Sequence, residues 1–526
     1  MFLLVWHKVG KVRDPAPLIL EFCLLSISFG AAGMHAYGQS WTVTIDTLSS
    51  LSFGMNIAED SEGRIHLAAS ETSSLSYPVF AAGHVFEFTA QGFLNGHLRI
   101  QFPDAGVTPY AILYNESLNR TLVFSTVYDS LAWTTASATS IGFSEYSPGL
   151  SLIEQHAIET GYSRASQVVT RSSADVITVA ITGNHYPNVF GGTIRLFQLN
   201  IVGDSLGNDS IYNGECACGV SSIRTKNNGD MVLATTQTGW SGTYSAGEVT
   251  YLHPNHSVVS VFGTPSYNDT LDYFNTIHQM FVALPLDNSD MILAGGIQPN
   301  GQLKGLVQRA DSTLATVSKQ FLPTTTSYGD IPALGQCISK NESDELFFGQ
   351  TEYFGPQLVT PTLGWPSRAH VWKLDTELNV LGDYVFDGFT DSLYYLLRAV
   401  QATVDGGALL SGSVADIRVG AADTRTKAWI AKIAPEDFTA AMPEHEKVRG
   451  WMFPNPGTNH LEIMLAKQLI CGTITITNVQ GQLVRQQELS GINFHISTEG
   501  IPPGLYAIGI KDRSGEAVFQ GSWVKE

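Results

Sequence analysis

Aromatic side chains are the residues of this chain whose types and positions best suit ligand recognition. Five of them fall in segments that follow the second predicted strand of a repeated unit: Tyr186, Trp240, Tyr244, Tyr353 and Trp365. Tyrosine and tryptophan rings stack on sugar faces and supply contact area for protein partners. The segments carry few charges, so we expect a ligand-binding face. The alternative, in which the rings only pack over strand ends, fits the sequence equally well.

Motifs of catalysis are scarce in this sequence. It contains no Gly-x-Ser-x-Gly elbow, no His-Glu-x-x-His, no phosphate loop and no calcium loop. Glu444-His445-Glu446 has metal-binding residue types, but it lies in a charged stretch between prolines, which favours a solvated turn. We therefore predict no metal and no cofactor. Catalysis stays open, because many carboxylates are present and some of them could converge in the fold.

Cysteine usage points to packing rather than chemistry. Downstream of the N-terminal segment the chain has Cys216, Cys218, Cys337 and Cys471. The first two are too close for an easy mutual disulfide, and no companion ligands surround them. We predict four small buried core residues. Their disulfide state is left open, because an oxidising compartment would permit bridges.

Composition indicates a folded chain of more than one domain. The sequence has 526 residues, of which 44% are hydrophobic and 15% charged. The formal net charge is −19, and no basic stripe is present. Nucleic-acid backbones require clustered Lys and Arg, so a nucleic-acid partner is excluded. The 50 glycines and many aromatic residues favour short strands joined by tight turns.

One pattern recurs between residues 39 and 434. In each unit a strand precedes a polar turn, and an apolar strand ending in small residues follows the turn. A third strand, which alternates with period two, and a fourth strand complete the unit. The markers of the turn stand 56, 57, 54, 60, 55 and 62 residues apart at Glu62, Leu118, Asp175, Gly229, Ser289, Asp344 and Gly406. Seven units of four strands predict an all-β fold, a seven-bladed β-propeller.

The two ends of the repeat region complement each other. The last unit has no fourth strand after Ile433, while a spare strand with one apolar face, Trp41–Ile45, precedes the first unit. We predict that the spare strand completes the last blade and closes the ring, which hides unpaired strand edges. An open solenoid or an array of two-sheet sandwiches is the alternative.

The N-terminus has the features of an export signal. Lys8, Lys11 and Arg13 precede an apolar run over residues 22–33, and small residues follow it. We predict a signal peptide over residues 1–38 with cleavage between Gly38 and Gln39. No other apolar run reaches the length of a membrane span, so no transmembrane segment is predicted.

The C-terminal residues 451–526 form a second module after a Pro-containing, charged linker at 435–450. Short alternating segments, including separate strands at 460–465 and 473–479, and the turns between them predict a small β-sandwich. The turn and strand motifs rest on Pro454, Asn455, Pro456, Gly481, Gly504 and Tyr506. In order and spacing they resemble the type A C-terminal sorting domain of the Bacteroidetes type IX (Por) secretion system. The family usually has a lysine-rich last strand, whereas here only Lys525 is present.

That resemblance implies a destination and partners. Such domains direct passage across the outer membrane after export to the periplasm, and a sortase-like protease then usually removes them. We therefore expect a secreted or cell-surface protein whose partners include the type IX secretion machinery and that protease. For the repeats we favour non-catalytic binding of a glycan or a surface protein. The alternatives are a polysaccharide hydrolase or lyase with carboxylates at the propeller channel, and an adhesion or gliding-associated surface component.

Overall fold

The computed structural model describes residues 39–526 with gaps. These fall at 49–50, 74–78, 130–131, 134–137, 185–192, 214–216, 239–244, 264–278, 298–303, 314, 323–328, 355–365, 420–425, 441–449, 454–456 and 514–516. Strands dominate the described residues, which confirms the all-β prediction. No helix within these ranges is long and apolar enough to cross a bilayer.

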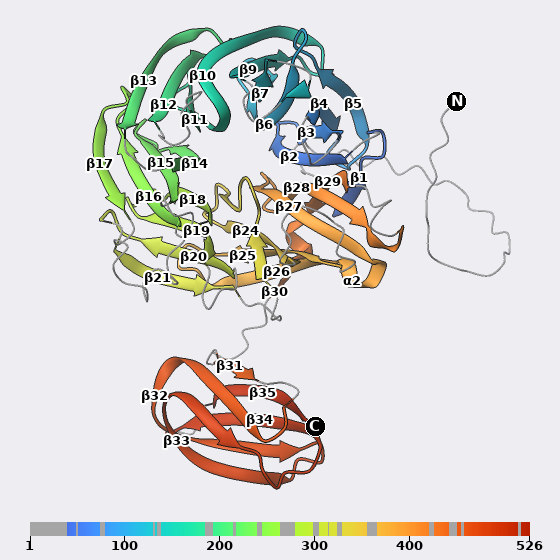
Figure 1. The fold of residues 1–526 in the computed structure, drawn as a ribbon, viewed down its shortest axis with the longest axis vertical. Helices are drawn as coiled ribbons and strands as arrows, with labels where there is room; N and C mark the ends of the chain where they lie inside the picture. Colours follow the sequence, from blue (N-terminus) through green and yellow to red (C-terminus); the bar gives the residue numbers. More distant parts are fainter. Residues whose placement is uncertain are drawn as a thin grey trace, which may run out of the picture. The chain divides into compact units, whose positions relative to one another are not determined.

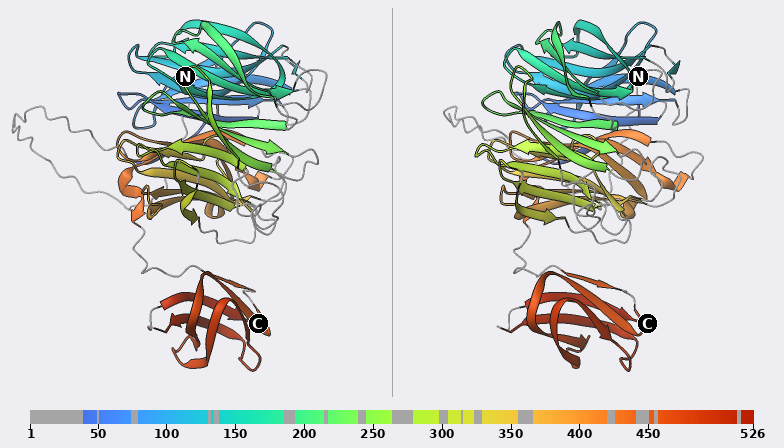
Figure 2. Two further views of the ribbon diagram at one scale, coloured as in Figure 1. Left: turned by 90° about the vertical axis from the view of Figure 1, so that its left-hand side faces the viewer. Right: turned by 60° about the vertical axis from the view of Figure 1, so that its left-hand side comes forward.

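The described strands up to residue 440 form antiparallel sheets that stand side by side around a common centre (Figures 1 and 2). The first sheet contains β2 (Leu51–Glu59), β3 (Ile65–Thr72), β4 (Val79–Phe88) and β5 (Leu94–Ile100), and β8 (Ala132–Trp133) pairs with β4. The second contains β6 (Gly106–Asn115), β7 (Arg120–Tyr128), β9 (Ala138–Tyr146), β10 (Leu152–Arg171), β11 (Val176–Asn184), β12 (Thr193–Asn200) and β13 (Ser205–Asn213). This is a propeller-like arrangement.

The remaining sheets of the ring follow in chain order. The third contains β14 (Ala217–Thr225), β15 (Met231–Thr238), β16 (Ser245–Leu252) and β17 (Val258–Gly263), and the fourth β18 (Gln279–Pro285), β19 (Met291–Ile297), β20 (Lys304–Ala310) and β21 (Thr316–Phe321). The fifth contains β22 (Gly329–Pro332), β23 (Ile338–Lys340), β24 (Leu346–Phe354), β25 (Arg368–Leu374), β26 (Val380–Asp387) and β30 (Thr439–Ala440). The last contains β27 (Leu393–Ala402), β28 (Ala408–Asp416), β29 (Thr426–Ile433) and β1 (Trp41–Thr44). Short helical turns are α2 (Gly388–Asp391), η3 (Ile417–Val419) and η4 (Pro435–Asp437).

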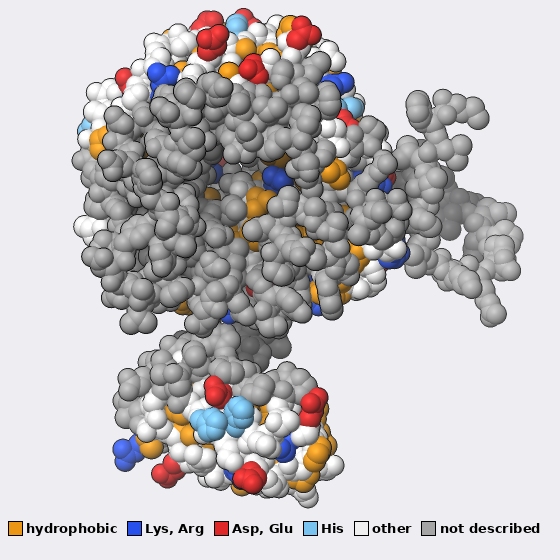
Figure 3. Space-filling model, in the orientation of Figure 1, with side chains coloured by type: hydrophobic (Ala, Val, Ile, Leu, Met, Phe, Trp, Pro, Cys, Tyr) orange, Lys and Arg blue, Asp and Glu red, His pale blue; other side chains and the backbone are white. Residues whose placement is uncertain are grey.

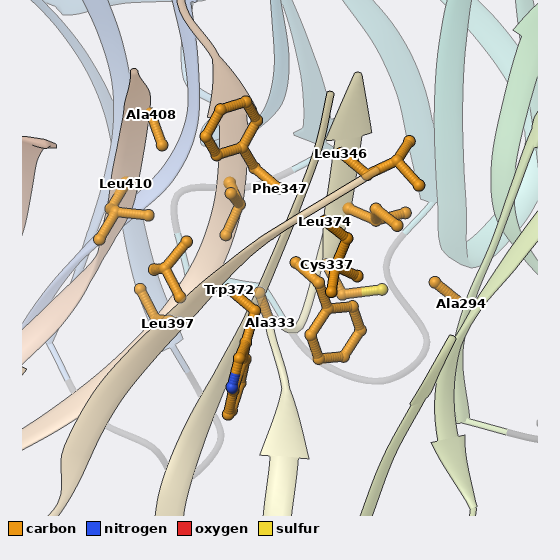
Figure 4. Packing of buried hydrophobic residues seen from close by; sticks show 14 of the residues in the cluster. Ala294, Ala333, Cys337, Leu346, Phe347, Trp372, Leu374, Leu397, Ala408 and Leu410 are labelled. Atoms are coloured by element: carbon orange, nitrogen blue, oxygen red, sulfur yellow. The ribbon is translucent and has the colours of Figure 1, made fainter. Parts of the chain in front are cut away.

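The apolar strand of each predicted unit is the second strand of its sheet, or of its half of the seven-stranded sheet, as in β3, β7 and β28. These strands are buried on both faces because a neighbouring sheet covers each side. Near-continuous apolar runs result. One hydrophobic cluster joins the last three sheets in this way, with Phe347, Trp372 and Leu410 among its members (Figure 4).

The seven-stranded sheet contains one long strand where the repeat pattern predicted the fourth strand of one unit and the first strand of the next. β10 spans 20 residues; its first part pairs with β9 and its last part with β11. The register shifts between Glu159 and Tyr162, next to Gly161, whose φ is +74°. A bulge with glycine in a left-handed conformation lets one strand bend and belong to two four-stranded sets.

The prediction that the first strand completes the last sheet is confirmed. β1 pairs antiparallel with β29, from Trp41 opposite Lys432 to Thr44 opposite Trp429. The Trp429 indole N–H donates to Thr42 Oγ1 at 2.7 Å. The Trp41 indole N–H donates to the carbonyl of Ala90, in the first sheet, at 3.0 Å. The N-terminal strand therefore connects the last sheet to the first.

Residues 435–440, which we predicted to begin the linker, instead continue along the ring. η4 covers Pro435–Asp437, and β30 pairs with β26 through Thr439 and Ala440. Residues 441–449 lie outside the described ranges.

The C-terminal module has its own core. Its strands are β31 (Gly450–Phe453), β32 (His460–Asn478), β33 (Leu483–Ser497), β34 (Gly504–Asp512) and β35 (Ala517–Lys525). Apolar side chains that include Ile476, Ile508 and Trp523 form one buried cluster. The predicted separate strands at 460–465 and 473–479 are one continuous strand, β32. The predicted turn at Gly481 is confirmed, with φ +78°.

The cysteine prediction was wrong at one position. Cys337 is buried, but Cys471 is exposed. In β32 the alternating residues Gly472, Ile474 and Ile476 are buried, so the period of two places Cys471 on the outer face. Cys218 lies in β14, and Cys216 lies outside the described residues.

Candidate ligand site at the centre of the ring

Of the first strands of the sheets, β2, β6, β14, β18 and β27 are labelled in Figure 1 and lie towards the centre of the ring. The second part of β10 ends with Arg171, β14 carries Arg224 near its end, and β27 carries Arg398. Arg224 and Arg398 are half-buried. Basic and hydrophobic side chains are visible near the centre of the ring in Figure 3.

A five-residue segment, 333–337, runs between β22 and β23 and contacts both β14 and β27. Ala333 and Cys337 anchor its ends in the hydrophobic cluster (Figure 4). The amide of Gly335 donates to the Arg398 carbonyl at 2.7 Å, and the Val400 amide donates to the Gln336 carbonyl at 2.9 Å. The segment thus adds parallel pairing between the fifth and last sheets, and we call it the crossing segment.

Arg224 reaches the crossing segment from a sheet that is not its neighbour. Its guanidinium donates to Gln336 Oε1 at 3.0 Å, across the position of the fourth sheet in the chain order. The Gln336 side-chain amide donates in turn to the Val400 carbonyl at 3.0 Å. Burial lowers the pKa of Arg224, because an enclosed cation loses hydration. The guanidinium also donates to the Ile223 carbonyl at 2.9 Å, so both of its described acceptors are neutral oxygens.

Arg398 lies over the ring of Phe53 in β2, with the guanidinium carbon 4.8 Å from the ring centroid. This cation–π contact crosses from the last sheet to the first. Burial lowers the pKa of Arg398 to about 10, so the group remains charged at neutral pH. Its Nε has no hydrogen-bond partner among the described residues. Neither arginine has a carboxylate within ion-pair distance in those same ranges.

Neutral polar groups on other first strands share this lack of partners. The Tyr110 hydroxyl in β6 and both polar atoms of the Gln167 side chain in β10 form no hydrogen bond within the described part of the chain. Burial raises the pKa of Tyr110 well above its usual value, so the phenol is protonated at neutral pH. Unsatisfied groups of this kind ordinarily bind water, an ion or a ligand.

A triad-like chain of Asp60, His66 and Thr121 lies elsewhere. His66 Nε2 is 3.2 Å from Asp60 Oδ2, and Thr121 Oγ1 is 3.2 Å from His66 Nδ1. Burial alone would raise the pKa of Asp60, but hydrogen bonds from His66 and Arg64 outweigh it and hold the value at about 2. His66 and Thr121 are 1% and 2% exposed, so no substrate reaches the hydroxyl. The chain ties the first sheet to the second.

Two histidines occupy matching places in the first and fifth sheets. His370 lies between Glu352 at 2.7 Å and Asp383 at 2.9 Å, and hydrogen bonds to these carboxylates outweigh burial and raise its pKa. His84 has Glu71 at 3.2 Å but another histidine, His97, at 3.0 Å.

Burial, and then repulsion from His97, lower the pKa of His84 to about 4. The described residues contain no group of three or more His, Cys, Asp or Glu side chains arranged to hold a metal ion. We therefore interpret both histidine clusters as links between strands.

Most of the predicted site residues lie outside the described residues. These are Tyr186, Trp240, Tyr244, Trp365, Pro454, Asn455, Pro456, Gly38 and the stretch Glu444-His445-Glu446. Tyr353 falls in β24, and Gln39 precedes β1. Gly481 and Gly504 stand at a turn and at the start of β34, and the Tyr506 hydroxyl donates to the Pro502 carbonyl at 2.6 Å.

Sequence reasoning missed the central arginines. The signal was a charged residue inside an otherwise apolar inner strand, as in Leu396-Leu397-Arg398-Ala399-Val400. Gln336 had no such signal, because its role depends on the crossing segment.

Comparison with known proteins identifies the C-terminal module. Residues 451–520 match the family model described as the secretion system C-terminal sorting domain. No curated protein matches the chain. The sorting domain directs export, so the protein is secreted or displayed at the cell surface and interacts with the secretion machinery.

Solved structures of propeller-like proteins share low identity with this chain. Virginiamycin B lyase from Staphylococcus aureus has a TM-score of 0.41 and 9% identity, over 75% of this chain and 99% of that one. A PL25 ulvan lyase has a TM-score of 0.44 and 7% identity, over 75% and 96%. PorZ, a surface component of the type IX secretion system of Porphyromonas gingivalis, has a TM-score of 0.27 and 13% identity, over 89% and 74%.

Proposed function

We propose that this protein is an exported, seven-bladed β-propeller that binds a ligand at the centre of its ring without catalysing a reaction. The observation that carries the proposal is the pair of half-buried guanidinium groups, Arg224 and Arg398, for which no described carboxylate serves as a partner. A cation enclosed without a counterion loses hydration that an incoming ligand can replace.

Seven blades follow if the long sheet is divided at β10. Its strands β6, β7, β9 and the first part of β10 make one set of four, and the rest of β10 with β11, β12 and β13 makes another. The seven sequence units and the pairing of β1 with β29 support this count. The separate core of the C-terminal strands supports a small β-sandwich that serves as the sorting domain.

Binding is favoured over a lyase or hydrolase by the state of the described hydroxyl groups. A general base must give up its proton near neutral pH. Tyr110 instead keeps its proton at neutral pH, because burial raises its pKa well above the usual value. The described nucleophile-like hydroxyl next to a histidine, Thr121, is closed to solvent.

The test measures binding and cleavage on the same samples. The exported chain, residues 39–526, is applied to an array of neutral and anionic glycans, and each bound polymer is then assayed for new reducing ends and for unsaturated products. We expect retention on one glycan class with no change in polymer length. Shortening of the polymer would contradict non-catalytic binding and support the hydrolase or lyase alternative. An array without any retained glycan would overturn the glycan form of the proposal and direct the search to surface proteins.

Export itself has a separate test. Deleting residues 451–526 should leave the remaining chain inside the cell envelope, as seen by fractionation. Release of the truncated chain into the medium at the full-length level would contradict the role of the sorting domain.

A further inference from the structure

A cavity of about 470 Å³ lies between two of the polar turns of the ring. One turn, residues 172–175, connects β10 to β11, and the other, residues 226–230, connects β14 to β15. The charged residues that line the cavity are Arg171 and Lys226, and the neutral ones are Ser172, Ser173, Ala174, Thr225, Asn227, Asn228 and Gly229. The lining is therefore positively charged, although the whole chain has a net charge of −19.

The Lys226 ammonium group has no hydrogen-bond acceptor among the described residues. Its Nζ lies 4.5 Å from the centroid of the Tyr251 ring. Asp230, in the same turn, has other partners: its carboxylate lies 3.1 Å from His253 Nδ1 and accepts from Asn228 Nδ2 at 2.7 Å. Burial lowers the pKa of Lys226, and the charge of Asp230 opposes this shift without forming an ion pair. The ammonium is thus partly desolvated and has no described counterion.

Arg171 is held beside the cavity by its own turn. Its Nη2 donates to the Ala174 carbonyl at 2.7 Å and lies 3.5 Å from Asn115 Oδ1. The described arginine–carboxylate pairs involve other arginines. Arg99 and Arg195 also have no described carboxylate partner, so the lack of one does not mark a site by itself. Arg171 differs from both because it lines a cavity together with a second cation.

The two turns beside the cavity leave a gap that no described hydrogen bond closes. Adjacent turns elsewhere in the ring are joined, as where Arg64 Nη2 donates to Asn119 Oδ1 at 3.2 Å. Here the contact lies on the strands before the turns, where the hydroxyl oxygens of Thr170 and Thr225 are 3.1 Å apart. Both turns are fully described, and no hydrogen bond runs between them. The strands therefore meet while the turns stand apart.

We propose that this cavity binds a doubly charged tetrahedral oxyanion between Arg171 and Lys226: inorganic sulfate, or phosphate that is free or carried as a monoester. Two positive charges without an acidic residue in the lining match two negative charges better than the single charge of a carboxylate. The guanidinium supplies paired N–H donors and the ammonium a point charge, and both bind phosphate oxygens. The Ser173 hydroxyl accepts from the Asp175 amide at 3.4 Å, so its own proton is free to donate to the anion.

This site is independent of the ligand proposed for the ring centre. Neither Arg224 nor Arg398 lines the cavity. With a net charge of −19, the protein repels anions at long range, so retention of a dianion requires a local basic site.

Titration calorimetry on the exported chain, residues 39–526, tests the proposal at constant ionic strength and about pH 8, where phosphate carries close to two charges. The probes are inorganic phosphate, glucose 6-phosphate, inorganic sulfate and, as a singly charged control, acetate. The variants are Arg171→Gln, Lys226→Gln and Lys226→Arg. Arg418→Gln is the matched control, because Arg418 is an exposed arginine paired with Asp416. Circular dichroism checks the fold of every variant.

We expect both inorganic dianions to bind, and acetate to bind at least about tenfold more weakly because it carries one charge fewer. Arg171→Gln and Lys226→Gln should each weaken phosphate binding by about tenfold or more, the effect of losing a hydrogen bond to a charged group. Lys226→Arg, which keeps the charge, should bind more tightly than Lys226→Gln, and Arg418→Gln should change the affinity by less than about twofold. If Arg171→Gln loses its fold, the comparison of the two Lys226 variants decides.

Glucose 6-phosphate distinguishes the sources of the anion. Tighter binding than that of inorganic phosphate would assign the site to a phosphate monoester, and weaker binding would assign it to a free ion. Equal affinity of all folded variants, acetate binding as tight as that of phosphate, or no binding of either inorganic dianion would overturn this inference. The function proposed for the ring centre would be unaffected, because its glycan array does not depend on this cavity.

Discussion

Replacing Trp41 with alanine should loosen the closing strand and leave the rest of the ring folded. Trp41 stands on β1 and reaches the first sheet, where its indole donates to the Ala90 carbonyl and lies 6.2 Å from the Phe88 ring. It also covers Gly92, where a Cβ would lie 2.5 Å from the indole. A single side chain therefore joins the edge of the last sheet to the first.

The magnitude follows from burial and one hydrogen bond. A fully buried tryptophan costs about 3–5 kcal/mol when truncated to alanine, and Trp41 is half-buried, so we take roughly 2 kcal/mol. The lost hydrogen bond adds about 1 kcal/mol. An opening free energy lower by about 3 kcal/mol corresponds to an increase in opening of roughly 100-fold.

Hydrogen exchange followed by mass spectrometry measures this opening. Amides of β29 that face β1 should exchange about 100-fold faster in Trp41→Ala, whereas amides of β15 should not change. Trp41→Phe keeps an apolar ring and loses only the hydrogen bond, so its effect should be under about tenfold. An unchanged rate in β29 for Trp41→Ala would refute the closing role of this residue.

Three further predictions follow from single residues. His84 has a folded pKa of about 4, below the unfolded value near 6.5, so its contribution to stability is present above pH 6.5 and is lost as the pH falls towards 4. In urea-unfolding experiments, His84→Gln should reduce the change in the free energy of unfolding between pH 6.5 and pH 4 by up to about 3 kcal/mol. A pH profile identical to that of the wild type would contradict this prediction. A Cβ at Gly412 would lie 2.1 Å from the Leu396 carbonyl oxygen, so Gly412→Ala should lower the denaturation midpoint strongly; a wild-type midpoint would be inconsistent with that packing. Iodoacetamide should label exposed Cys471 in the native protein, but Cys337 only after unfolding, because burial raises its pKa to about 12; peptide mass spectrometry distinguishes the two.

Much of the ring was predictable from the sequence because its strands are short and alternate between faces. The turn before β3, with Gly63 at φ +75°, and the apolar run after it follow the pattern that marks every unit. The spare strand at Trp41 predicted ring closure, since a missing fourth strand and an unassigned one complement each other.

Other features were not predictable because they depend on contacts between distant residues. The two parts of β10 and of β32 looked like separate strands, since alternation does not show whether a bend interrupts hydrogen bonding. The central site escaped prediction for a related reason. Arg224 and Gln336 are 112 residues apart, and neither has a local pattern that announces the contact.

Pairing of β1 with β29, close to the end of the ring, imposes an order on folding. β1 can pair with β29 only after Lys432, the partner of Trp41, has been synthesised. The loop-closure entropy of a contact between residues so far apart in the sequence makes this pairing slow to form. Until translation passes residue 433, the polypeptide has no complete circle to form. The edge strand of the last sheet therefore gains its partner only after nearly the whole ring has been synthesised.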